Sequence, residues 1–190
     1  RLRRHASHCV WSDQKASAMR VVERLIALGH RDIAFITGSL DSPTGVERLA
    51  GYKDALAGHG IALNEALIAE GRWTPETGAA AVESLRQRGV TYSALVASND
   101  DMAIGAIEAI KEKGLKIPEE VAVFGFSNSK RSRYMTPSVS TINQFPEKIG
   151  ETAAELLFEQ ILDAKHAQIR EEVINSELIV RESSDRSFMQ

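Results

Sequence analysis

Long apolar runs are missing from this sequence, and so is an excess of positive charge. No run of about 18 or more apolar residues occurs, which excludes a transmembrane helix. The net charge at pH 7 is −3, whereas a domain that binds nucleic acid by itself is usually basic. We therefore predict no contact with a membrane and no DNA binding by this chain alone.

Cysteine is almost absent, because Cys9 is the single cysteine among 190 residues. One cysteine excludes an internal disulfide framework and fits a reducing compartment. We therefore expect a cytoplasmic protein. The chain begins at Arg1 without an initiator methionine, so we expect a fragment of a longer protein.

The common signatures of catalysis are also lacking. The sequence contains no Gly-x-Gly-x-x-Gly, no Walker loop, no Gly-x-Ser-x-Gly and no zinc-ligand spacing. Asp100 and Asp101 could form a carboxylate pair, but neighbouring residues at a helix start point in different directions. Helix capping and the helix dipole explain them better. We predict that the chain is not an enzyme and holds no cofactor or metal.

What is present is clearest in residues 93–128, which read as strand, helix, strand. A short apolar run over 94–97 is followed by polar residues that can cap a helix, and a second β-prone run covers 121–126. Two buried strands joined by a helix are typical of a parallel sheet with a right-handed crossover. In open sheets of this kind, ligands bind at the carboxyl ends of the strands.

The rest of the chain repeats this alternation. Further strands are predicted over 9–12, 33–36, 67–69, 139–142 and 173–180. Thr44 to Glu47 match a capping box that opens a helix to about Leu56, and Thr74 caps another with Pro75 at its first position. Residues 129–137 read as a loop and 182–190 as a polar tail. The order predicts an α/β fold with a doubly wound parallel sheet.

Polar residues from separate loops are expected to meet at the carboxyl edge of this sheet: Arg48, Trp73, Asn99 or Asp100, and Ser127 or Asn128. Arginine and amide groups can hold adjacent hydroxyls, and an indole can cover the apolar face of a sugar ring. The mixture therefore favours a polyol ligand. Two alternatives stay open, since Arg48 could form a surface ion pair with Glu47 or Asp54, and Trp73 could belong to the core.

Several sequence motifs resemble those of the effector-binding core of the lactose/galactose-repressor family of bacterial transcription regulators. They lie at 28–36, 47–52, 98–106, 114–126, 136–142 and 180–184. The match covers almost everything from Val10 to Ser184. The resemblance implies a type I periplasmic-binding-protein-like module with one lobe nearly complete and the other partial. It implies that residues 1–13 end the first lobe, 14–140 form the second, 141–165 return to the first, and 166–190 cross back.

The same resemblance implies a repressor that binds a sugar-like effector between two lobes and binds DNA through a helix-turn-helix head upstream of Arg1. A secreted sugar-binding receptor of a transport system is the alternative, and an α/β enzyme a third class. The effector-binding residues it implies are Thr44, Arg48, Trp73, Asn99, Asp100, Ser127, Asn128 and Phe145. Ser127 and Asn128 stand where the family usually has two aspartates, so less negative charge faces the ligand.

A homodimer is also expected. The segment 103–108 is apolar on more than one face, and an otherwise polar loop carries Tyr134 and Met135. Aromatic residues and methionine are enriched in interface cores, and the resemblance places dimer contacts in the same two segments. The predicted interface residues are Ala103, Ile104, Ile107, Tyr134 and Met135.

Overall fold

The chain forms two compact units in the computed structural model, which describes residues 7–162, 169–185 and 187. Unit 1 comprises Arg1–Asp13 and Gln144–Glu177, and unit 2 comprises Gln14–Asn143 and Leu178–Gln190. The boundaries between the two units therefore fall after residues 13, 143 and 177, whereas the sequence predicts these boundaries after residues 13, 140 and 165.

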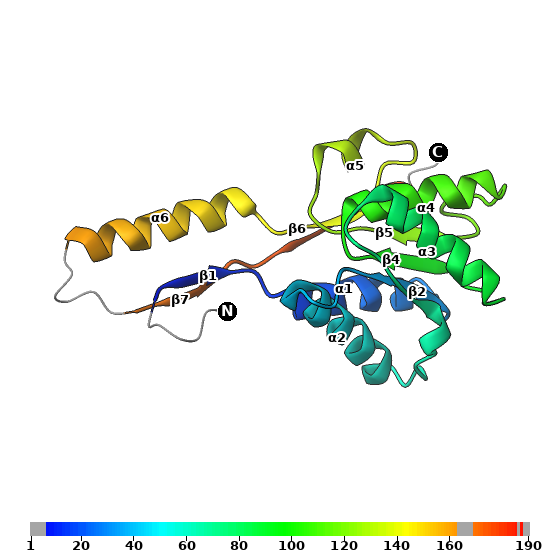
Figure 1. Ribbon diagram of the computed structural model, residues 1–190, viewed down its shortest axis with the longest axis horizontal. Coiled ribbons are helices and arrows are strands. Elements are labelled where there is room, and N and C mark those ends of the chain that lie inside the picture. The colour runs from blue at the N-terminus through cyan, green and yellow to red at the C-terminus, as the bar shows by residue number, and fades with distance from the viewer. Residues whose placement is uncertain (1–6, 163–168, 186, 188–190) are drawn as a thin grey trace. The chain divides into compact units, whose positions relative to one another are not determined.

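Unit 2 is built on a four-stranded parallel sheet in the order β3-β2-β4-β5. Figure 1 labels β2, β4 and β5 of this sheet. Its strands are β2 (Ile33–Thr37), β3 (Ile68–Glu70), β4 (Ala94–Ala97) and β5 (Ala122–Phe124). Phe124 forms a further parallel bridge with Ser140, just before β6 (Thr141–Asn143), which pairs with β8 (Glu177–Ile179). Each predicted strand of this sheet lies within two residues of its predicted position.

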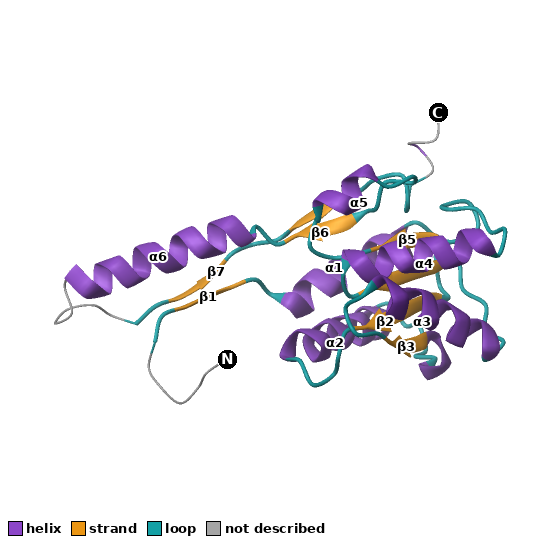
Figure 2. Cartoon of the chain, turned by 45° about the horizontal axis from the view of Figure 1, so that its top comes forward, coloured by secondary structure: helices purple, strands orange, loops and turns teal. Residues whose placement is uncertain are grey.

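Helices cover both faces of the sheet, with α1 (Gln14–Ala27) and α2 (Pro43–Gly58) on one face and α3 (Pro75–Gln87) and α4 (Asp100–Glu112) on the other (Figure 2). Successive strand residues point to opposite faces. Ile33 and Phe35 accordingly belong to the core under α1 and α2, whereas Ala34 and Ile36 belong to the core under α3 and α4. This arrangement confirms the predicted doubly wound α/β fold.

Local polar residues explain where the helices begin. Thr74 caps α3 and Asn99 caps α4, as the sequence predicts. The capping box predicted at Thr44 is wrong, because α2 begins earlier: Ser42 is its N-cap residue and Pro43 occupies the first turn. Proline is favoured there because its fixed φ suits the helix and its missing N–H costs nothing. Thr44 therefore lies inside the first turn.

Two small residues bring α3 and α4 into backbone contact. A side chain at Gly78 would collide with the backbone of Met102 in α4, and one at Gly105 would collide with the carbonyl of Pro75 in α3. The two helices consequently touch near their N-terminal ends. This fixes the starts of both helices relative to each other at the carboxyl edge of the sheet.

A predicted loop, a predicted strand and the predicted tail have a different structure from the one expected. The loop over 129–137 contains a short helix, α5 (Lys130–Tyr134), capped by Ser129. The single strand predicted over 173–180 is two strands, since β7 (Glu171–Val173) pairs with β1 (Cys9–Trp11) and β8 pairs with β6. The predicted tail is packed at its start, where Ser183 and Ser184 are buried.

Unit 1 contains β1, β7 and the long helix α6 (Pro146–Leu162). The predicted apolar stripe of α6 is present, but Leu156 is its only buried residue within the described chain. Leu157, Phe158 and Ile161 are each more than half exposed. Among the described residues, no helix combines the length and apolarity that crossing a membrane requires.

Candidate functional site at the carboxyl edge of the unit 2 sheet

The loops that follow β3, β4 and β5 carry four of the eight predicted effector residues. Trp73 follows β3, Asn99 follows β4, and Ser127 and Asn128 follow β5. Because the strands are parallel, their carboxyl ends meet at one edge of the sheet. Arg48 joins them from α2, the helix that follows β2. Its guanidinium lies within reach of both Trp73 and the end of β4, so the structure brings these residues together.

Arg48 is the buried cation of this edge, with 5% of its surface exposed. Its Nε and Nη2 donate to Gln14 Oε1 at 3.0 and 2.7 Å, and its Nη1 donates to the carbonyl of Ser98. The guanidinium carbon lies 4.4 Å from the ring centre of Phe126 and 6.0 Å from that of Trp73. The alternative of a surface ion pair with Glu47 or Asp54 is wrong, because the guanidinium is buried and bonds to Gln14 and Ser98. Asp54 pairs with Lys15 instead.

Burial lowers the pKa of Arg48 to about 10, an effect that the negative charge of Asp100 partly opposes. The guanidinium therefore stays charged at neutral pH. A charge in a water-poor site is costly unless it is hydrogen-bonded. Gln14 and the Ser98 carbonyl supply those bonds, and the flat faces of two aromatic rings lie nearby.

Trp73 occupies a left-handed backbone conformation, with φ of 70°. Its six-membered ring lies against Gly38, where any side chain would collide with it. The indole is half-buried and packs on the core under α3 and α4. Its remaining exposed surface is available to a ligand, so the core and ligand interpretations of Trp73 are compatible.

Asn99 links the two helix starts. Its Oδ1 accepts from the N–H of Met102 at 2.9 Å and caps α4, while its Nδ2 donates to the carbonyl of Trp73 at 2.8 Å. The amide thus holds Trp73 at the start of α3 to the start of α4. Both ends of the side chain bond to the protein itself.

Asp100 lies below the surface, with 1% of its area exposed. Its Oδ1 accepts from Thr141 Oγ1 at 2.6 Å, and its Oδ2 accepts from the N–H of Ser129 at 2.7 Å. Burial raises the pKa of this carboxyl group, although these bonds act in the opposite direction. Gly125 makes the arrangement possible, because a side chain there would collide with the carboxylate. Asp100 therefore joins α4 to the starts of α5 and β6.

Ser127 and Asn128 form a strained turn after β5, with φ of 103° and 49°. The exposed Ser127 hydroxyl donates to the carbonyl of Phe126. Asn128 Oδ1 accepts from Arg181 Nη2 at 2.6 Å. Residues in left-handed backbone other than glycine cost free energy and gather at functional sites.

The left-handed residues coincide with the predicted site. Among the described residues, those other than glycine with positive φ are Trp73, Ser127, Asn128 and Phe145, and all four are predicted effector residues. Phe145 belongs to unit 1, where it is half-buried with φ of 51°. Thr44 is half-buried one turn before Arg48 on α2.

Three supporting residues escape prediction from the sequence: Gln14, Phe126 and Arg181. Gln14 and Phe126 hold the guanidinium of Arg48. Arg181 donates to the carbonyl of Val139 at 2.7 Å as well as to Asn128. Arg181 lies in the motif at 180–184, which resembles the C-terminal motif of the family. This motif does not reveal its partner Asn128, which lies 53 residues away in the sequence.

The predicted dimer residues fall into two groups. Ala103, Ile104 and Ile107 are fully buried in the core that α4 shares with α3 and the sheet, so they present no surface to a partner. The apolar character of α4 on several faces is explained by this chain alone. Tyr134 is 81% exposed, and Met135 is partly buried against the same core. The described residues contain no cluster of acidic, histidine or cysteine side chains that could hold a metal ion.

Residues 22–184 match the family of periplasmic binding protein-like domains, and the chain belongs to this family. It is similar to the HTH-type transcriptional regulator AscG of Escherichia coli strain K12, with 55% identity over 159 residues that cover 83% of the chain and 47% of AscG. It is 35% identical to the HTH-type transcriptional regulator CelR of Thermobifida fusca, over 90% of the chain and 50% of CelR. The chain thus spans about half the length of these curated relatives.

Solved structures give the same result. The E. coli transcriptional repressor ascG matches with a TM-score of 0.84 and 48% identity, covering 96% of this chain and 66% of that one. The complex of CelR with cellobiose matches with a TM-score of 0.88 and 34% identity, covering 94% and 54%. The predicted resemblance to regulators of the lactose/galactose-repressor type is confirmed.

Proposed function

We propose that this chain is the effector-binding domain of a repressor-type transcriptional regulator. A small sugar-like molecule binds at the carboxyl edge of the unit 2 sheet, and its presence changes DNA binding by a helix-turn-helix head outside these 190 residues. The observation that carries the proposal is the buried, charged guanidinium of Arg48 beside the half-exposed Trp73. The regulators AscG and CelR among the relatives, and the cellobiose in the CelR complex, support it.

The site residues take two roles in this proposal. Trp73 covers the apolar face of the sugar ring, and Arg48 and Ser127 face its oxygen atoms. Asn99 and Asp100 act as positioning residues, because their side-chain oxygens already accept hydrogen bonds from the protein. Asn128 is held in place by Arg181.

Calorimetric titration with sugars, nucleosides and sugar phosphates identifies the effector, and the variant Trp73→Ala then tests the site. We expect this change to weaken binding at least tenfold, because stacking and shape are both lost, whereas Leu63→Ala, at an exposed residue outside the site, leaves binding unchanged. Trp73→Phe should retain part of the affinity, and circular dichroism verifies that each variant is folded. Equal affinity of Trp73→Ala and the wild type would contradict the assignment.

The regulator and the secreted receptor predict different responses of the full-length protein. For a regulator, the effector identified by titration changes operator affinity in a gel-shift assay. For a receptor, the same ligand binds but operator affinity is absent or unchanged. The second result would contradict the proposed function even if the ligand site is correct.

We also propose a homodimer in which Tyr134 and Met135 contribute to the contact. Tyr134 is a large, 81% exposed aromatic residue on α5, and aromatic residues and methionine are enriched in interface cores. Sedimentation of the full-length protein tests this with Tyr134→Glu, which we expect to weaken the dimer. Leu40→Glu, at a residue that is 45% exposed elsewhere, is the control.

A further inference from the structure

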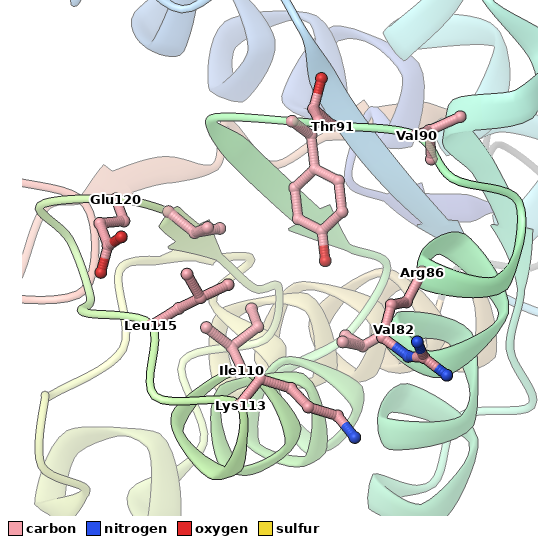
Figure 3. Close-up of a pocket in the computed structure, with 10 residues that line it drawn as sticks. Val82, Arg86, Val90, Thr91, Ile110, Lys113, Leu115 and Glu120 are labelled. Atoms are coloured by element: carbon pink, nitrogen blue, oxygen red, sulfur yellow. The ribbon is translucent and has the colours of Figure 1, made fainter.

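A cavity lies at the opposite, amino edge of the unit 2 sheet, with a volume of about 400 Å³ (Figure 3). It is lined by residues just before β4 and β5 and by the C-terminal halves of α3 and α4. Cavities of this size are within the range that holds small-molecule ligands. None of the predicted effector residues lines it.

The walls of this cavity are mainly aliphatic. Val82, Ile110 and Val121 form its buried part, and Val90 and Leu115 extend it toward solvent. Branched aliphatic walls favour an apolar ligand body, since burying apolar surface contributes roughly 25 cal/mol per Å². The cavity therefore favours ligands with a large apolar surface.

One polar group among these walls stands out. Tyr92 lines the cavity, and its hydroxyl has no hydrogen-bond partner among residues 7–162, 169–185 and 187. Burial raises the pKa of Tyr92, so the phenol stays protonated at neutral pH and can donate. A directed donor in an apolar cavity selects a ligand that carries an acceptor oxygen.

The charged residues at the rim do not call for a charged ligand. Arg86 donates to Glu83 at 2.6 and 2.9 Å, and Lys113 lies 3.6 Å from the same carboxylate. These contacts lower the pKa of Glu83 to about 2, and the carboxylate pairs with both cations. Glu120 lies on the other side of the cavity from Arg86 and Lys113 (Figure 3) and accepts from the N–H of Lys116.

Two further effects oppose an anion. The C-terminal ends of α3 and α4 carry the negative ends of the helix dipoles. Moving a carboxylate out of water into aliphatic walls is also costly. The exposed and already paired cations cannot offset both, because exposed ion pairs contribute little. An uncharged ligand avoids these costs.

We propose that this cavity is a second ligand site, which takes a small uncharged molecule with an aromatic or branched apolar body and one acceptor oxygen that bonds to Tyr92. Methyl phenylacetate is a suitable probe, and phenylacetate is its charged counterpart with the same skeleton. Methyl-labelled NMR of the 190-residue chain reports where each probe binds. We expect saturable shifts at Val82, Ile110 and Val121, without change at the indole N–H of Trp73.

Matched variants test the two recognition elements. Tyr92→Phe should weaken binding of methyl phenylacetate about three- to tenfold, since one neutral hydrogen bond is lost, while Tyr134→Phe leaves it unchanged. Leu115→Trp should abolish binding by filling the cavity. Leu63→Trp is its control, because Leu63 and Leu115 are both 39% exposed and Leu63 lies elsewhere.

Three results would overturn the proposal. The first is the absence of saturable shifts at the cavity methyl groups, whether the shifts map to Trp73 instead or none occur up to the solubility limit of the probe. The second is phenylacetate binding as tightly as its methyl ester, which would refute an uncharged ligand. The third is shifts of the cavity methyl groups with protein concentration alone, which would show that a second copy of the chain covers the cavity.

Discussion

Replacing Arg48 by lysine keeps the charge but not the geometry, and this substitution separates two roles of the residue. The guanidinium donates twice to Gln14 and once to the carbonyl of Ser98, and it stacks on Phe126. A lysine ammonium is a compact, strongly hydrated charge that cannot match this fork. Arg48→Ala would remove any ligand contact and the support of the edge together, so loss of binding alone would be ambiguous.

The structure gives the magnitude. If lysine keeps one of the three bonds, two charge-assisted bonds are lost, at about 1.5 kcal/mol or more each. Loss of stacking adds about 0.5–1 kcal/mol. New protein bonds to the ammonium and local relaxation recover part of this loss. We therefore expect Arg48→Lys to lower the free energy of unfolding of unit 2 by about 2–4 kcal/mol.

Urea unfolding followed by the fluorescence of Trp73 measures this change, in a Trp11→Phe background so that unit 2 alone is observed. Arg72→Lys is the control, because Arg72 is exposed, and a surface substitution of this kind changes stability by about 0.5 kcal/mol or less. An Arg48→Lys variant as stable as the wild type would refute the structural role. Arg48 would then act on the ligand only.

Three further predictions test the edge and the helix contact. Burial raises the pKa of Asp100 above its ordinary 3.8, so the folded chain holds this proton more tightly and the group's contribution to stability falls as pH rises above 3.8. Asp100→Asn, which can still bond to Ser129 and Thr141, should remove that fall, as urea midpoints from pH 3.5 to 7 would reveal. Gly105→Ala should destabilise unit 2 by about 1–3 kcal/mol through overlap with α3, whereas Gly58→Ala, in open space, should stabilise it by about 0.4–1 kcal/mol in thermal unfolding. Ser127→Asp should raise affinity for hydroxyl-rich ligands several-fold in calorimetry, because a carboxylate accepts more strongly than a hydroxyl; unchanged affinity places Ser127 outside the site.

The sheet and its helices could be predicted because their signals are local. Strands buried on both faces appear in the sequence as continuous apolar runs. Thr74 and Asn99 mark the starts of the helices that follow, because each caps a helix N-terminus. The split of 173–180 into β7 and β8 could not be predicted. Both halves are β-prone, and only the partner strand decides where each belongs.

The sequence could predict which side chains lie at the carboxyl edge of the sheet, but not the contacts that hold them there. The sequence around Asp100 is that of an ordinary helix N-terminus, where an aspartate is usually exposed. Asp100 is buried instead, because it bonds to Ser129 and Thr141, which lie 29 and 41 residues away in the sequence. Ile104 looks available for a partner because apolar residues surround it on several faces of the helix. The close approach at Gly105, which buries it against α3, depends on two helices at once.

That close approach makes α3 and α4 a single support that reaches from the effector edge to the cavity. The contact at Gly105 stands six residues from Asn99 and eight from Lys113, which at 1.5 Å per residue is about 9 and 12 Å along α4. A molecule that pushed the C-terminal ends of the two helices apart would strain the backbone contacts at Gly78 and Gly105, and with them the hydrogen bond from Asn99 to the Trp73 carbonyl. By linkage, a ligand in the cavity and a ligand at the edge would then alter each other's affinity by the same factor.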